Sequence, residues 1–143
     1  MNKRSTGPIA ALPLLGLLAL LAGGDVLAAS ARTNYLQYCS GCHRPTGEGK
    51  APNVPTLHGE LGRMVAVPAM RSYLFRVPGA AHTPLSDAEL VAVVNWVLME
   101  FNKETLPEKF QPITAEEAAR WRQDILADPL RYREEHWGAY DWK

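Results

Sequence analysis

The sequence predicts an all-α fold with long loops, and three observations support this prediction. In the clearest periodic segment, apolar residues recur every three or four positions, as they do on one face of a helix. These residues are Leu90, Val93, Val94, Val97, Leu98 and Phe101. Capping boxes, in which a Ser or Thr precedes a Glu by three positions, begin at Ser86 and at Thr114. No segment alternates apolar and polar residues for long, so the chain offers no clear strand.

The first 28 residues are predicted to be a secretory signal peptide. Lys3 and Arg4 precede a 15-residue apolar run, and small residues follow it up to Ala28. An uncleaved membrane anchor is the alternative, but a bilayer span needs about 20 apolar residues. We expect cleavage after Ala28, with Ala31 as the second choice. The mature chain would then be periplasmic, with no stable membrane insertion.

Residues 29–143 are enough for one small domain. The whole chain has a formal net charge of 0, and loss of Lys3, Arg4 and Asp25 with the signal peptide leaves −1. This balance indicates neither a nucleic-acid partner nor binding to an anionic membrane surface.

The chemistry-bearing motif is Cys39-Ser40-Gly41-Cys42-His43, a C-x-x-C-H sequence. Two thiols at this spacing can form thioethers with the vinyl groups of a haem, and the histidine can ligate its iron. The motif therefore predicts one covalently bound haem c, held through Cys39 and Cys42, with His43 as the proximal iron ligand.

A zinc half-site, a redox dithiol and a structural disulfide are the alternatives for the two cysteines. A zinc site needs further Cys or His residues at matching spacing, and the chain has no third cysteine. A redox dithiol is expected near a βαβ pattern, which this sequence lacks.

The segments around the motif are predicted to frame the haem. Residues 30–40 are expected to form a short helix with Ala31 and Tyr35 on one face. Proline and glycine over residues 44–58 exclude a long helix or a central strand there. A ligating histidine needs its second ring nitrogen fixed, often by a backbone carbonyl. The segment Pro55-Thr56-Leu57 is the best local candidate to supply that carbonyl.

The chain is predicted to divide into a signal peptide (1–28), a haem domain (29–101) and a C-terminal extension (102–143). Within the haem domain, residues 69–77 are expected to form two helical turns. Within the extension, a helix over about 115–127 is expected, followed by an aromatic tail. The aromatic residues of this tail are Tyr132, Trp137, Tyr140 and Trp142.

Residues 29–101 resemble a class I cytochrome c, a small monohaem electron carrier. The features that carry this resemblance are Tyr35 four positions before the first cysteine, the C-S-G-C-H motif, the Pro55-Thr56-Leu57-His58-Gly59 stretch, and the helix from Ser86 through Leu98. The resemblance implies that the N-terminal and C-terminal helices cross beside the haem. It also implies that the carbonyl of Pro55 accepts a hydrogen bond from His43.

The sequence departs from this family at the sixth iron ligand. Family members usually place a methionine in the loop before the last helix, but here the loop between Gly79 and Ser86 is short and has none. The first candidate is His82, which lies inside this loop and has an imidazole able to bind iron. Met70 is the second candidate, and an open or water-bound iron is the third.

Electron transfer is the leading functional hypothesis, because an iron ligated on both faces has no free coordination site. The partners would be periplasmic redox proteins, with a dehydrogenase as donor or an oxidase as acceptor. We see no acid pair, nucleophile triad or phosphate loop, so we expect a carrier and not an enzyme. The alternatives are a ligand sensor or peroxidase with an open distal site, and a haem subunit of a periplasmic dehydrogenase or oxidase complex.

Overall fold

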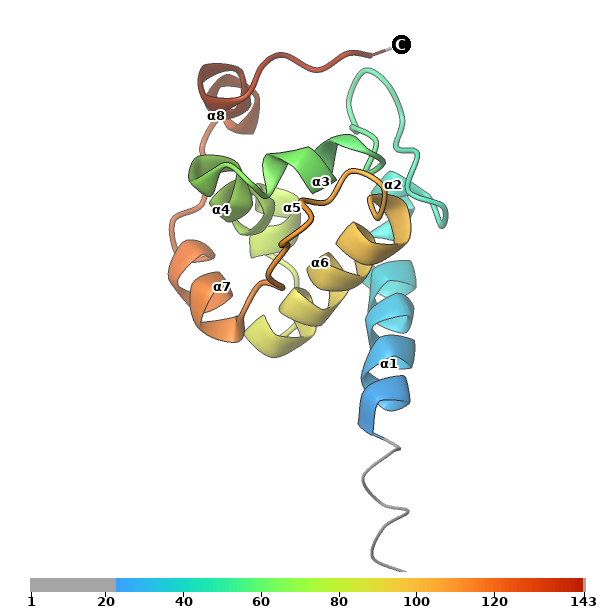
Figure 1. Ribbon diagram of the computed structural model, residues 1–143. Coiled ribbons are helices and arrows are strands. Elements are labelled where there is room, and N and C mark those ends of the chain that lie inside the picture. The colour runs from blue at the N-terminus through green and yellow to red at the C-terminus, as the bar shows by residue number, and fades with distance from the viewer. Residues whose placement is uncertain (1–22, 143) are drawn as a thin grey trace, which may run out of the picture.

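The structure is a computed structural model that describes residues 23–142 (Figure 1). These residues form helices and no strand; the only β pairing among them is an isolated bridge between Lys50 and Val54. The prediction of an all-α fold is therefore confirmed. The helices are α1 (Gly23–Tyr38), α2 (Ser40–His43), α3 (Glu60–Met64), α4 (Pro68–Arg76), α5 (Pro78–Ala81), α6 (Asp87–Phe101), α7 (Ala115–Trp121) and α8 (Pro129–His136).

Most of the predicted signal peptide lies outside the described residues, and it stays a prediction. Helix α1 (Gly23–Tyr38) runs through the expected cleavage site after Ala28. Among the helices of residues 23–142, none is both long enough and apolar enough to cross a membrane.

Helices α1 and α6 pack against each other, as the cytochrome resemblance implies (Figure 1). Tyr35 is fully buried at this contact, with its ring centroid 5.1 Å from that of Trp96 and 5.7 Å from that of Phe101. Ala31, one turn earlier on α1, is also buried. A small residue beside an aromatic one lets the two helices approach closely, and this contact fixes the end of α1 where the haem motif begins.

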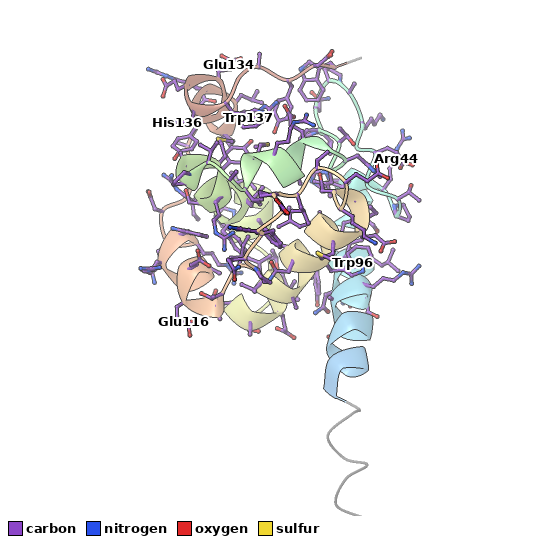
Figure 2. All side chains as sticks on the ribbon, in the orientation of Figure 1. Arg44, Trp96, Glu116, Glu134, His136 and Trp137 are labelled. Carbon is purple, nitrogen blue, oxygen red and sulfur yellow. The ribbon has the colours of Figure 1, made fainter. Side chains whose placement is uncertain are left out.

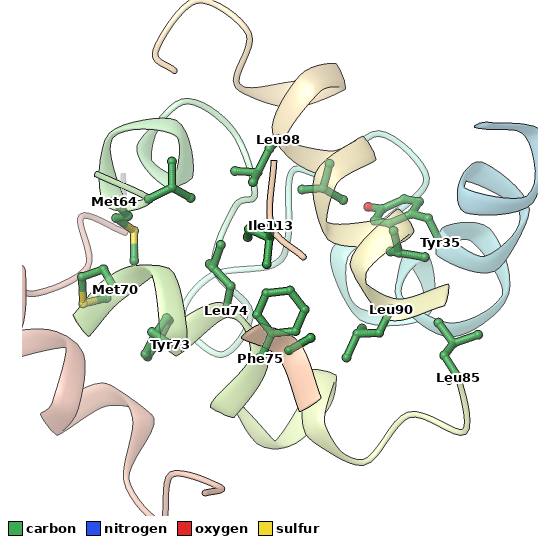
Figure 3. Packing of buried hydrophobic residues seen from close by; sticks show 14 of the residues in the cluster. Tyr35, Met64, Met70, Tyr73, Leu74, Phe75, Leu85, Leu90, Leu98 and Ile113 are labelled. Carbon is green, nitrogen blue, oxygen red and sulfur yellow. The ribbon is translucent and has the colours of Figure 1, made fainter. Parts of the chain in front are cut away.

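Helix α6 supplies much of the core (Figure 3). Its capping box is present, with Ser86 accepting from the backbone N–H of Glu89 and the Glu89 carboxylate accepting from that of Ser86. The predicted apolar stripe is confirmed, because four of its residues are buried and the other two pack against the core. The buried residues are Leu90, Val93, Val97 and Leu98, and the partly buried ones are Val94 and Phe101.

The C-terminal extension differs from its prediction in two places. The helix expected over 115–127 ends at Trp121, and the side chain of the capping residue, Arg122, donates hydrogen bonds to the carbonyls of Ala81 and Leu85. The residues expected to form an aromatic tail include helix α8. Asp128 caps this helix and Pro129 occupies its first turn, so two ordinary helix-start signals lie at this point.

The extension (102–142) is fastened to residues 29–101 along its length. Arg71 of α4 forms an ion pair with Glu117 of α7, and Asn95 of α6 exchanges two hydrogen bonds of 2.9 Å with the backbone of Ile113. Farther on, the backbone N–H of Leu126 donates to the carbonyl of Arg76. Both α7 and α8 therefore lie on the side of the molecule formed by α4, away from α1 (Figure 1).

Candidate haem site

A cavity of about 520 Å³ lies between the C-x-x-C-H motif, helices α3 to α6 and the C-terminal extension. Its volume falls within the roughly 300–1,000 Å³ typical of cofactor and ligand sites. Helix α6 contributes the largest part of the apolar wall. The α6 residues in this wall are Leu90, Val93, Val94, Val97 and Leu98.

The motif itself forms part of the cavity wall. Cys39, Cys42 and His43 all line the cavity. Helix α1 ends at Tyr38, and α2 is a single turn in which the backbone N–H of His43 donates to the carbonyl of Cys39 over 3.0 Å. This turn brings two thiols and an imidazole to the same apolar space, as a covalently attached haem would require.

The imidazole of His43 is oriented by the loop that follows it. Nδ1 of His43 lies 3.1 Å from the carbonyl oxygen of Pro55, to which it donates as the Nδ1–H tautomer. Nε2 is then the nitrogen available to a metal. Burial lowers the pKa of His43, and the hydrogen bond to Pro55 offsets this only in part. The neutral imidazole, which is the form that binds iron, is therefore favoured.

Gly49 lets this loop close against the motif. Its backbone N–H donates to the carbonyl of His43 over 3.2 Å, and its φ is +70°. A Cβ atom at this position would overlap the carbonyl oxygen of Pro55. Gly49 is therefore needed for its backbone conformation and for its close approach to the carbonyl that orients His43.

Gly49→Ala should lower the free energy of unfolding by at least about 1–2 kcal/mol, because a non-glycine residue is strained at this φ. The new methyl group should also displace the Pro55 carbonyl, so a haem iron bound to His43 would be released at a higher pH when the holoprotein is acidified. Denaturant titration and an acid titration followed by absorbance measure the two effects. Gly41→Ala is the control, since a Cβ there meets nothing within 4 Å. Equal behaviour of the two variants would contradict the role given to Gly49.

The surroundings of the thiols do not favour the redox-dithiol alternative. Burial, with a smaller contribution from Cys42, raises the pKa of Cys39 to about 11. A redox-active cysteine instead has a lowered pKa that keeps its thiolate populated near neutral pH. Within residues 23–142, no group of three or more His, Cys, Asp and Glu side chains comes together as a metal site.

The two candidates for the distal ligand lie outside the cavity wall. His82 is exposed at the C-terminal end of α5. Met70 is fully buried in the core (Figure 3), where the view places it near Met64 and far from Tyr35. The structure therefore brings together Cys39, Cys42, His43 and Pro55, but not His82 or Met70.

Several cavity residues were not predicted as site residues. Glu60 of α3, Tyr73 of α4, and Leu130 and Tyr140 of the extension all line the cavity. The hydroxyl oxygens of Tyr73 and Tyr140 lie 3.0 Å apart. The aromatic residues of the C-terminal segment were the available signal for a role of the extension at the cavity. The distance of this segment from the C-x-x-C-H motif along the chain did not indicate where it would pack.

Comparison with known proteins gives two relatives with the same description, and no protein-family model matches the chain. One cytochrome c-552 of Thermus thermophilus is 28% identical over 133 residues, covering 76% of this chain and 90% of the relative. The similarity supports a c-type cytochrome. A second cytochrome c-552 of Thermus thermophilus is 27% identical over 114 residues, covering 63% of this chain and 87% of the relative.

The similarity to these cytochromes covers more of the chain than the predicted haem domain. Residues 29–101 make up about half of the 143 residues, whereas the first relative aligns with 76% of them. The alignment therefore supports a c-type cytochrome through more than its haem motif.

Proposed function

We propose that this chain is an exported monohaem c-type cytochrome that transfers electrons between periplasmic redox proteins. The haem would be bound through thioethers to Cys39 and Cys42, with His43 as the proximal iron ligand. The observation that carries this proposal is the placement of both thiols and the oriented imidazole on the wall of one apolar cavity. The similarity to two cytochromes c-552 supports the same function.

The residues of the cavity fit such a group. Apolar side chains of α6 would pack against the macrocycle and exclude water, which raises the influence of each nearby charge on the reduction potential. The haem would supply an iron that takes up and releases one electron. The carbonyl of Pro55 would hold the His43 imidazole in place by accepting a hydrogen bond from its Nδ1–H. The imidazole would therefore move little when the iron gains or loses an electron.

The partner is expected to dock where the cavity reaches the surface. Cys42 is exposed there, and the side chains of Tyr38 (40% exposed) and Leu130 (54% exposed) line the cavity while also facing solvent. The mature polypeptide has a charge of −1 before haem is added, so long-range steering should be weak and the electron-transfer rate should depend little on salt. Transient complexes between redox proteins typically bury only a small interface area.

An optical redox titration of the purified holoprotein tests this proposal. We expect a reversible couple that follows a one-electron Nernst curve and a protein that passes electrons to a second redox protein at nearly the same rate in low and high salt. An irreversible couple, or loss of haem on reduction, would contradict a role as electron carrier.

The proximal ligand is tested by His43→Gly with imidazole added back. The variant should lose the wild-type absorption spectrum, because the iron loses its oriented nitrogen ligand, and free imidazole should restore much of it. His136→Gly is the matched control, since His136 lies on the exposed face of α8 (Figure 2). A wild-type spectrum in the His43 variant without imidazole would assign the iron to another residue.

A further inference from the structure

Glu60 of α3 brings a formal charge to the mostly apolar wall of the cavity. Among the described residues that line this cavity there is no Asp, Lys or Arg, and Glu60 is the sole Glu. Its neighbours on the wall include Leu61 of α3 and Leu74 of α4. A carboxylate beside apolar side chains is screened by solvent and salt less than a carboxylate on an open surface. Its charge therefore acts strongly on a group that occupies the cavity.

The opposite charge comes from helix α8 of the C-terminal extension. Nη2 of Arg133 donates to both carboxylate oxygens of Glu60, over 2.9 and 2.8 Å, and Nε1 of Trp137 donates to one of them over 2.8 Å. The guanidinium also lies 3.7 Å from the ring centroid of Tyr140, which is itself part of the cavity wall. The positive charge of Arg133 is therefore held next to two residues of this wall, Glu60 and Tyr140.

Stability alone is a weak reason for such a pair. Arg133 is completely buried, and its Nε–H has no hydrogen-bond partner among the residues that the structure describes. Taking a guanidinium out of water is costly, and apolar side chains of similar volume often stabilise a fold as well as a buried ion pair does. What apolar side chains cannot supply is a fixed charge balance beside the cavity.

The size of the cavity puts this pair within electrostatic reach of a haem that fills it. A space of about 520 Å³ is on the order of 10 Å across, so a residue of its wall lies within roughly that distance of an iron at the centre of the haem. This estimate does not depend on how the haem is oriented. At an effective dielectric constant of about 20, one unit charge at this distance changes a one-electron equilibrium roughly tenfold.

We propose that the Glu60–Arg133 pair sets the reduction potential of the haem. An unpaired Glu60 would favour the oxidised iron, which carries one more positive charge than the reduced iron, and Arg133 cancels this effect. The extension then serves electron transfer as well as stability, because it supplies the cation that keeps the potential from falling. This inference rests on the proposed function, since it needs the haem that Cys39, Cys42 and His43 would hold.

Reduction potentials of the purified holoprotein and its variants test this proposal. At the applied potential that leaves wild type half reduced, Glu60→Gln should raise the ratio of reduced to oxidised haem about threefold to tenfold, because only the positive charge remains. Arg133→Met should lower this ratio by a similar factor, because only the negative charge remains. The double variant Glu60→Gln with Arg133→Met has neither charge and should titrate within about twofold of wild type.

The opposite signs separate an electrostatic role from a structural one. Both single replacements break the same contact between α3 and α8, and looser packing that admits water to the haem would favour the oxidised state in both variants. Glu135→Gln is the matched control, because Glu135 is the carboxylate of an ion pair with Arg131 on the same helix and its side chain is 53% accessible. Its replacement should change the ratio by less than about twofold.

Arg133→Lys keeps the positive charge and guards against a methionine variant that does not fold. It should titrate close to wild type, and a lysine variant shifted as far as the methionine variant would contradict the role given to the charge. Unchanged potentials in both single variants, or shifts of the same sign, would overturn the proposal. Haem that is absent, not covalently attached or not reversibly reduced would instead reject the proposed function.

Discussion

Replacing Cys39 and Cys42 together by alanine is expected to leave almost no folded holoprotein. Without thioethers, the haem would be held by His43 and by apolar contact alone, and its loss would expose the apolar walls of a cavity of about 520 Å³ to water. Each large apolar side chain left exposed there loses about 1.5–3 kcal/mol of burial free energy. Since the total stability of a small domain is about 5–15 kcal/mol, the native packing should not survive.

The cysteine variant is best compared with wild type after export and purification, by haem absorbance per protein and by near-ultraviolet circular dichroism. Ser40→Ala is the matched control, because Ser40 lies between the thiols and only donates a hydrogen bond to the carbonyl of Leu36. This control should keep its haem. A double cysteine variant with wild-type haem content and a native near-ultraviolet spectrum would show that attachment is not what holds the fold together.

The second large effect is expected at Arg133. Arg133→Met should lower the free energy of unfolding of the holoprotein by about 3 kcal/mol, because it leaves the Glu60 carboxylate without its buried cation. We place the value at the low end of the range for a broken buried pair, since the side chain of Glu60 is 32% exposed. The variant should also loosen Tyr140 and Leu130, which close one side of the cavity.

Arg131→Met is the natural control for this measurement. Arg131 lies on the same helix, and its ion pair with Glu135 is largely exposed, with side chains 76% and 53% accessible. Its replacement should leave the denaturation midpoint almost unchanged. If the two arginine variants were equally stable, the extension would not depend on the Glu60–Arg133 pair for its attachment.

Local signals in the sequence were sufficient for the helices that start at a capping box. Ser86 with Glu89 and Thr114 with Glu117 form the predicted boxes, and the stripe on α6 faces the core. These features could be predicted because each depends on residues three or four positions apart. The C-x-x-C-H motif is local in the same sense, and both thiols and the imidazole line one cavity.

The ends of the extension helices could not be predicted as well, because long-range contacts decide them. Helix α7 ends next to Arg122, whose side chain donates hydrogen bonds to the carbonyls of Ala81 and Leu85. The start of α8 was present in the sequence as Asp128 followed by Pro129, but the same pair also ends a helix. The aromatic, charge-rich composition of the residues in α8 indicated a tail. No local pattern shows which of these charged residues will be buried.

Arg133 illustrates this limit. It lies among other charged residues on a short helix, yet it is completely buried, and its partner Glu60 is 73 positions away. The cavity residues Tyr73 and Tyr140 are likewise brought together from distant segments. The first choice for the distal ligand depended on the place of His82 in the loop before the last helix, and His82 and Met70 stay predictions.

Covalent attachment of one haem to an exported chain is tested most directly by the intact mass of the protein, produced with its own N-terminal sequence and denatured in acid and organic solvent. We predict the mass of residues 29–143 plus one haem, with no unmodified chain and no haem in the solvent phase. A mass equal to the polypeptide alone, with the haem extracted or absent, would contradict the assignment of Cys39 and Cys42 as attachment sites.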